Sequence, residues 1–164
     1  MKILGIDPGL EATGIALVEF DFSNLKVLLL DTLYTNDKYS LPEKFALIFN
    51  YIKNIVTSYS PDWMVIEEVF TQKYPFSATK IAQVQAILFL IAGLYNIPVK
   101  TYHPTEVKKA ITGSGRANKE DIKNIVLSLF PVGGKDLSDH AIDALSLAYL
   151  LTIEMGNTGM FNVV

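Results

Sequence analysis

Three strand-like segments stand at the start of the chain, and they constrain the fold more than any other feature. They cover residues 2–7, 13–20 and 25–35, and only the short links PGLEA and DFSN separate them. Links of this length and composition join neighbouring antiparallel strands, so the segments predict a three-stranded meander. The first link follows Asp7 and reads as an ordinary Asp-Pro-Gly turn, which needs no functional role to explain it.

Helices and strands alternate after the meander. Ser40 and Glu43 have the spacing of a capping box and predict a helix whose apolar stripe runs to Tyr59. We expect a strand over 62–67, a helix over 77–95 that lies against the sheet, and a strand over 97–102. Helices are then expected over 104–111, 119–130 and 139–154. This order predicts an α/β domain over 1–154 with a mixed five-stranded sheet and helices on both faces, as in the ribonuclease H-like fold.

The composition limits the kinds of protein and cellular location that the chain is compatible with. Half of the 164 residues are apolar, which suffices for one sizeable core, and the absence of cysteine excludes disulfides and thiolate metal sites. The longest apolar run, AILFLIAGL, is shorter than the roughly 20 residues that span a bilayer. The chain starts without a secretory signal pattern, and residues 155–164 have no periodicity and are expected to form a mobile tail. We therefore expect a soluble, cytoplasmic protein that does not contact a membrane.

Charge is unevenly distributed along the chain. Residues 69–135 hold nine of the fourteen basic residues and three acids, so this segment carries +6 while the whole chain carries −3. A polyanion responds to the local field of one face, so the segment is compatible with a nucleic-acid partner. The same lysines would also suit an ordinary solvated surface.

Acidic residues stand where strands end and where the last helix begins. Asp7 and Glu67 end the first and fourth predicted strands, which are parallel neighbours in the ribonuclease H-like fold. Asp139, His140 and Asp143 occupy adjoining positions at the start of the last helix. Helix capping explains Asp139, whereas Asp143 lies beyond the first turn and interrupts an apolar helix.

Several unpaired anions at the edge of a sheet destabilise a protein by several kcal/mol per ion, on the order of magnitude known for buried charges. A divalent cation would compensate for them. Oxygen ligands suit Mg²⁺ or Mn²⁺, and two ions roughly 3.5–4 Å apart would support phosphodiester hydrolysis. An imidazole ligand shifts the preference towards Mn²⁺, so we expect higher activity with that ion.

Four stretches of the chain closely resemble the RuvC family of Holliday junction endonucleases. They read ILGIDPG, VIEEVF, EVKKAITGSGRANKE and HAIDALSLA, in the family's order and spacing, and they span roughly residues 1–150. The resemblance implies a bacterial or phage homodimer that nicks four-way DNA junctions symmetrically with a divalent metal. It also implies a branch-migration motor complex as a partner.

The resemblance assigns roles to individual residues by position. The catalytic acids of the family fall on Asp7, Glu67 and Asp143, and the fourth metal-ligand position falls on His140. Spacing alone leaves Asp139 open as an alternative to His140.

Further positions correspond to contacts with DNA. Lys108 and Lys119 match lysines that approach the DNA backbone, and Phe70 matches an aromatic residue that stacks at the junction centre. Arg116, in the basic link between two helices, is a further candidate for DNA contact. Without the family match, the lysines would be read as solvated residues and Phe70 as a core residue.

Two positions depart from the family pattern. The long central helix reads AQVQA where GQARG is common, so Gln85 lacks a positive charge, and Asp121 stands where most relatives have glutamine. Cleavage preference and DNA affinity therefore cannot be carried over from relatives at these positions.

Other functions remain open at this point. The GIDPG stretch also resembles the first phosphate loop of actin-like and sugar-kinase ATP-binding modules, which would use Gly9 and Thr13, but such proteins need a second copy of the fold. A ribonuclease H-like nuclease with another nucleic-acid substrate, or a junction-binding protein that does not cleave, would fit most of the same residues.

Overall fold

The sheet has the predicted topology. The structure is a computed structural model that describes residues 1–21, 24–68, 75–130 and 137–157. Its strands are β1 (Lys2–Asp7), β2 (Ala12–Phe20), β3 (Leu25–Tyr34), β4 (Trp63–Glu67) and β5 (Val99–Tyr102). They lie in the order β3-β2-β1-β4-β5, with β1 and β3 antiparallel to β2, β1 parallel to β4, and β4 parallel to β5. The meander and the mixed five-stranded sheet are thus confirmed.

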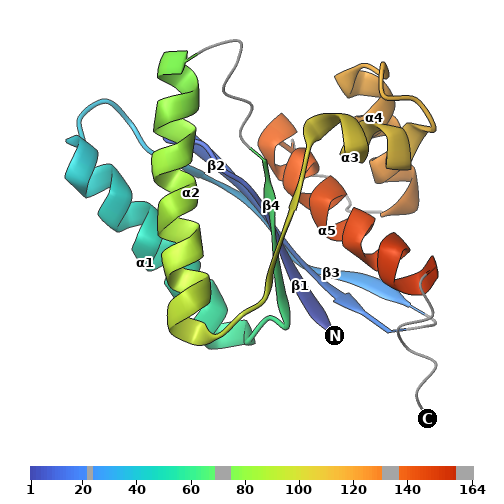
Figure 1. Cartoon of the computed structure of the whole chain (residues 1–164), viewed down its shortest axis with the longest axis horizontal. Helices are drawn as coiled ribbons and strands as arrows, with labels where there is room; N and C mark the ends of the chain where they lie inside the picture. The colour runs from blue at the N-terminus through green and yellow to red at the C-terminus, as the bar shows by residue number, and fades with distance from the viewer. Residues whose placement is uncertain (22–23, 69–74, 131–136, 158–164) are drawn as a thin grey trace.

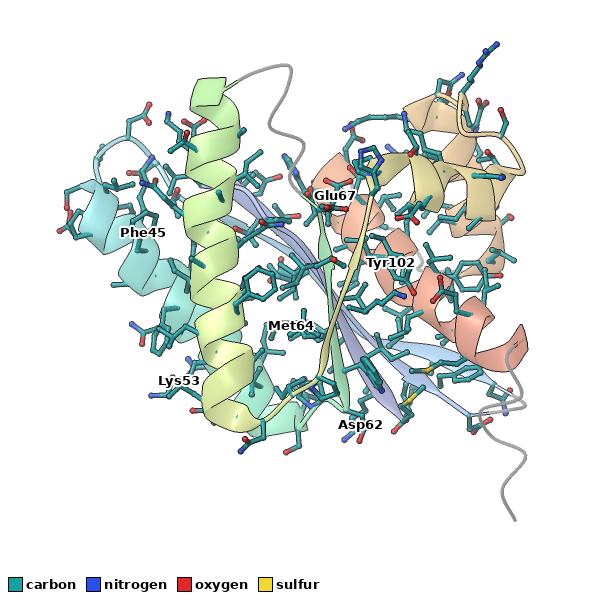
Figure 2. The ribbon with its side chains drawn as sticks, viewed as in Figure 1. Phe45, Lys53, Asp62, Met64, Glu67 and Tyr102 are labelled. Carbon is teal, nitrogen blue, oxygen red and sulfur yellow. The ribbon has the colours of Figure 1, made fainter. Side chains whose placement is uncertain are left out.

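Helices cover both faces of the sheet, as expected (Figure 1). On one side lie α1 (Leu41–Tyr59) and α2 (Pro75–Tyr95), and on the other lie α3 (Pro104–Thr112), α4 (Lys119–Leu129) and α5 (Asp139–Asn157). Each face buries its own apolar cluster. Leu4 and Ile6 of β1 pack with α1 and α2, whereas Ile3 packs with the α5 side. The same alternation in β4 places Met64 towards α2, and Tyr102 of β5 lies on the α5 side (Figure 2).

The last helix is longer than the sequence pattern suggests. An end at residue 154 is predicted, but α5 continues to Asn157. Met155 is only 6% exposed and packs in the same apolar cluster as Leu151, one turn earlier. This burial stabilises the additional helical residues, since tertiary packing stabilises helix ends more than local propensity does.

Among the described residues, one face of α2 lies against the rest of the protein. Val84, Leu88 and Ile91 are fully buried, while Leu90 and Leu94 are 56% and 59% exposed. The helical window Ala78–Tyr95 is long and apolar enough to cross a membrane by length and composition. The uninterrupted apolar run AILFLIAGL, from which the sequence predicts no membrane span, is shorter than this window. Within this window 28% is buried inside the protein, and the buried residues of α2 form part of the core with α1.

Candidate active site

Strand alternation places Asp7 and Glu67 on the same face of the sheet. On β1, Leu4 and Ile6 point towards α1 and α2, so Asp7 points towards α5. Ile6 is paired with Ile66 across the parallel β1–β4 ladder. The next residue of each strand is an acid, so Asp7 and Glu67 occupy neighbouring positions. Figure 2 shows Glu67 at the end of β4, beside the start of α5. The two carboxylates lie side by side at one edge of the sheet.

Glycine on the neighbouring strand allows α5 to approach this edge. Gly14 is paired with Asp7, and a Cβ atom on Gly14 would lie 1.9 Å from the carbonyl oxygen of His140. A Cβ atom on Gly5 would likewise lie 2.2 Å from the carbonyl oxygen of Ala144, one turn further along α5. Contacts this short exclude any side chain, so the backbone of α5 rests directly on β1 and β2.

The first turns of α5 deliver the imidazole and the third acid. His140 Nδ1 lies 2.6 Å from Asp7 Oδ2, which joins residues 133 positions apart. Asp143 is half-buried and interacts electrostatically with Asp7 and Glu67. Asp139 instead lies 4.0 Å from the Lys123 ammonium group, and its side chain is 59% exposed. The structure therefore brings His140, and not Asp139, to Asp7.

Two lysines predicted to contact DNA stand in the same hollow as two of the acids. A hollow of about 200 Å³ is lined by Glu67, Asp143, Lys108 and Lys119, with Pro104, Val107, Ile122 and Leu147 completing its wall. Lys119 Nζ lies 3.6 Å from Asp143 Oδ2.

Of the remaining two residues predicted to contact DNA, the structure describes one. Arg116 is exposed in the link between α3 and α4 and is not among the lining residues. Phe70 lies outside the described residues.

The acids are crowded enough to change their protonation. Burial raises the pKa of Glu67 to about 8, and the negative charges of Asp7 and Asp143 act in the same direction, with Lys119 opposing them. Burial also raises the pKa of Asp143, again against the nearby Lys119. The hydrogen bond to Asp7 raises the pKa of His140 despite its partial burial. The clustered side chains therefore favour the binding of protons or cations at this edge of the sheet.

The side chains at this site are of the kinds that bind a hard divalent cation. Three carboxylates and one imidazole converge from β1, β4 and α5. Burial together with neighbouring negative charge raises the pKa of Glu67 and of Asp143, and a bound cation would neutralise that charge. Among the described residues, however, no three such side chains already stand in a metal-binding arrangement. His140 and Lys119 are engaged with Asp7 and Asp143, so an ion would have to exchange with these contacts.

Both departures from the family pattern have structural roles, which the sequence did not reveal. The Gln85 side-chain amide donates to the Glu67 carbonyl oxygen at 2.6 Å, which fastens the end of β4 to α2. Asp121 accepts from the Asn118 N–H at 3.1 Å, and its own N–H donates to Asn118 Oδ1 at 2.9 Å. This capping box fixes the start of α4, the turn that carries Lys119.

The fold and the acid cluster together define a nuclease domain of the ribonuclease H-like class. A sequence model of the family described as crossover junction endodeoxyribonuclease RuvC matches residues 3–150. A relative of that name from Cupriavidus metallidurans is 37% identical over 150 residues, which cover 90% of this chain and 81% of the relative. Another from Parvibaculum lavamentivorans is 36% identical over 148 residues, covering 90% and 84%. The chain belongs to the RuvC family of crossover junction endodeoxyribonucleases.

Solved structures share the fold. The structure described as T. thermophilus RuvC in complex with a Holliday junction substrate has a TM-score of 0.88 and 23% sequence identity, with 96% of each chain covered. A Fowlpox virus resolvase in complex with substrate Holliday junction DNA has a TM-score of 0.58 and 16% identity, covering 92% of this chain and 99% of the resolvase. At this level of identity, the likeness shows a shared architecture.

Proposed function

We propose that this chain resolves Holliday junctions by metal-dependent hydrolysis of phosphodiester bonds, with Asp7, Glu67, His140 and Asp143 as the ligands of two Mg²⁺ or Mn²⁺ ions. The main observation in support is the convergence of three acids from β1, β4 and α5, where burial, together with the charges of Asp7 and Asp143, raises the pKa of Glu67. Membership of the RuvC family supports four-way junction DNA as the substrate.

Each group has a separate task in this proposal. Divalent ions, when bound, supply activation of the attacking water and stabilisation of the departing oxygen. Asp7, Glu67 and Asp143 would hold these ions through hard oxygen donors, and His140 would become a further ligand once an ion replaces its contact with Asp7. Lys108 and Lys119, in the same hollow as Glu67 and Asp143, bind the phosphate backbone. Phe70 stacks on a base and Arg116 adds a peripheral phosphate contact.

The exposed face of α2 supports a homodimer. Phe89, Leu90 and Leu94 lie on one side of this helix at 45%, 56% and 59% exposure, and they are too apolar to face water without cause. Symmetric nicks require two active sites related by a two-fold axis, which an isologous contact between two copies of α2 would supply. The family resemblance further supports a branch-migration motor complex as a partner and a cytoplasmic location.

A cleavage assay tests the proposal. The purified protein is incubated with a mobile four-way junction or with a linear duplex of the same sequence, in Mn²⁺ or in EDTA. We expect paired, symmetric nicks in the junction only, and only with the metal. Equal cutting of the duplex would indicate a nuclease with another substrate, and junction binding without nicks in Mn²⁺ would indicate a structural binding protein. Either result would contradict the proposal.

A further inference from the structure

A second hollow lies beside the acid cluster, apart from the one that holds Lys108 and Lys119. Its volume is about 360 Å³, and it is lined by the turn over residues 9–12, by Lys80 and Ile81 of α2, and by His140. This size falls in the range of ordinary ligand pockets, roughly 300–1,000 Å³. His140 connects the hollow to the acid cluster, because this residue lines the hollow and its Nδ1 atom lies 2.6 Å from Asp7 Oδ2.

The acid cluster is therefore flanked by two hollows. Glu67 and Asp143 line one of them, and His140 lines the other. A phosphate at the cluster belongs to a continuous DNA strand, so it has one nucleotide on its 5′ side and another on its 3′ side. We propose that the second hollow holds the nucleotide on one side of the scissile phosphate, with Lys80 contacting the DNA backbone there. This inference rests on the proposed junction-cleaving function.

The wall of the hollow is built from a fastened turn. The Thr13 hydroxyl donates to the Gly9 carbonyl oxygen at 2.7 Å, and the Thr35 N–H donates to the Glu11 carbonyl oxygen at 2.9 Å. The Thr35 hydroxyl also donates to the Leu10 carbonyl oxygen. Thr13 and Thr35 are only 1% and 7% exposed, so both serve to hold the turn. A preformed surface of this kind binds with little loss of conformational entropy.

The lining suits a nucleotide. The half-buried Ile81 offers an apolar surface for a base or sugar, with the largely buried Leu10 beside it, and the exposed Lys80 supplies the positive charge for a phosphate. Glu11 is also exposed on the lining and would repel a phosphate placed near it. The charges therefore favour one orientation, with the backbone towards α2 and the base towards the turn.

The test measures junction binding as a function of salt concentration, in EDTA so that no cleavage occurs. The logarithm of the association constant falls linearly with the logarithm of the salt concentration. Removing one phosphate contact makes this slope shallower by about 0.9 for duplex DNA and about 0.7 for a single strand. We expect Lys80→Ala to make the slope shallower by this amount. The matched control is Lys53→Ala, on α1 and well away from Glu67 in Figure 2, which should leave the slope unchanged.

A second variant tests the shape of the hollow. Ala12→Leu fills the space beside the turn, and we expect it to raise the Kd for the junction several-fold while its melting temperature stays near that of the wild type. Lys80→Ala with an unchanged slope, or a folded Ala12→Leu protein with unchanged Kd, would overturn the inference.

Lys119→Ala in the same experiment separates this inference from the proposed function. If Lys119→Ala makes the slope shallower and Lys80→Ala does not, only the inference about the second hollow is contradicted. If the wild-type protein does not prefer a junction to a duplex, the proposed function itself fails.

Discussion

Replacing Glu67 with glutamine should stabilise the metal-free protein at alkaline pH while removing its activity. The pKa of Glu67 is raised from 4.5 to about 8, so in the folded protein this carboxyl keeps its proton over a pH range where the unfolded chain has lost it. The folded state is therefore favoured at low pH, and stability is lost as the pH rises between these two values. Glutamine cannot ionise and is exempt from this loss.

The size of the effect follows from the same pKa. Each tenfold change in proton affinity corresponds to about 1.4 kcal/mol, so ionisation of Glu67 lowers the free energy of unfolding by about 3 kcal/mol between pH 5 and pH 8. The raised pKa values of Asp143 and His140 produce losses of the same sign. These losses occur in both proteins, so the difference between the two proteins reports the ionisation of Glu67 together with its mutual repulsion with Asp7 and Asp143.

Urea denaturation in EDTA at pH 5 and at pH 8 measures the difference directly. We expect similar stability at pH 5 and a more stable Glu67→Gln variant at pH 8, by on the order of 3 kcal/mol. Glu68→Gln, an exposed carboxylate one residue away, is the control and should change little. A Glu67→Gln variant that is destabilised equally at both pH values would refute the reasoning, because Glu67 would then contribute packing and not buried charge.

Three other outcomes follow from the site. Asp143→Asn should abolish cleavage but leave junction binding near the wild-type level, which an electrophoretic mobility assay in EDTA measures; lost binding with retained cleavage would reverse the assignment. Metal titration of the cleavage rate should show higher activity with Mn²⁺ than with Mg²⁺, because His140 supplies a nitrogen donor, and the opposite order would argue against His140 as a ligand. Gly14→Ala should destabilise the protein by about 1–3 kcal/mol and weaken Mn²⁺ binding measured by calorimetry. Gly93→Ala, where a Cβ atom meets nothing within 4 Å, is its control, and unchanged Mn²⁺ binding in Gly14→Ala would show that the approach of α5 does not position the ligands.

Local features of the sequence predicted the sheet and the positions of three acids. Short turns fixed the pairing of the meander, and strands that end in Asp7 and Glu67 had to place those acids at one edge once β1 and β4 were parallel neighbours. Helical spacing placed Asp143 near them. These predictions succeed because turn length, strand period and helix period act within a few residues.

Contacts between distant segments could not be predicted in this way. Asp139 and His140 are adjacent in sequence, and the contacts of Asp139 with Lys123 and of His140 with Asp7 show which of the two faces the acids. The approach of the His140 backbone to Gly14 and the hydrogen bond from Gln85 to Glu67 also depend on packing between elements far apart in the chain. The spacing of apolar and polar residues along the sequence does not indicate that Gly14 or Gln85 makes such contacts.

Anomalous diffraction from crystals of the protein grown with Mn²⁺ tests the central claim most directly. The account predicts anomalous peaks with carboxylate oxygens of Asp7, Glu67 and Asp143 within about 2.0–2.3 Å, the range expected for ions of this size, and with Lys119 moved away from Asp143. Peaks elsewhere on the protein, or an acid cluster that stays without Mn²⁺ at saturating concentration, would contradict it.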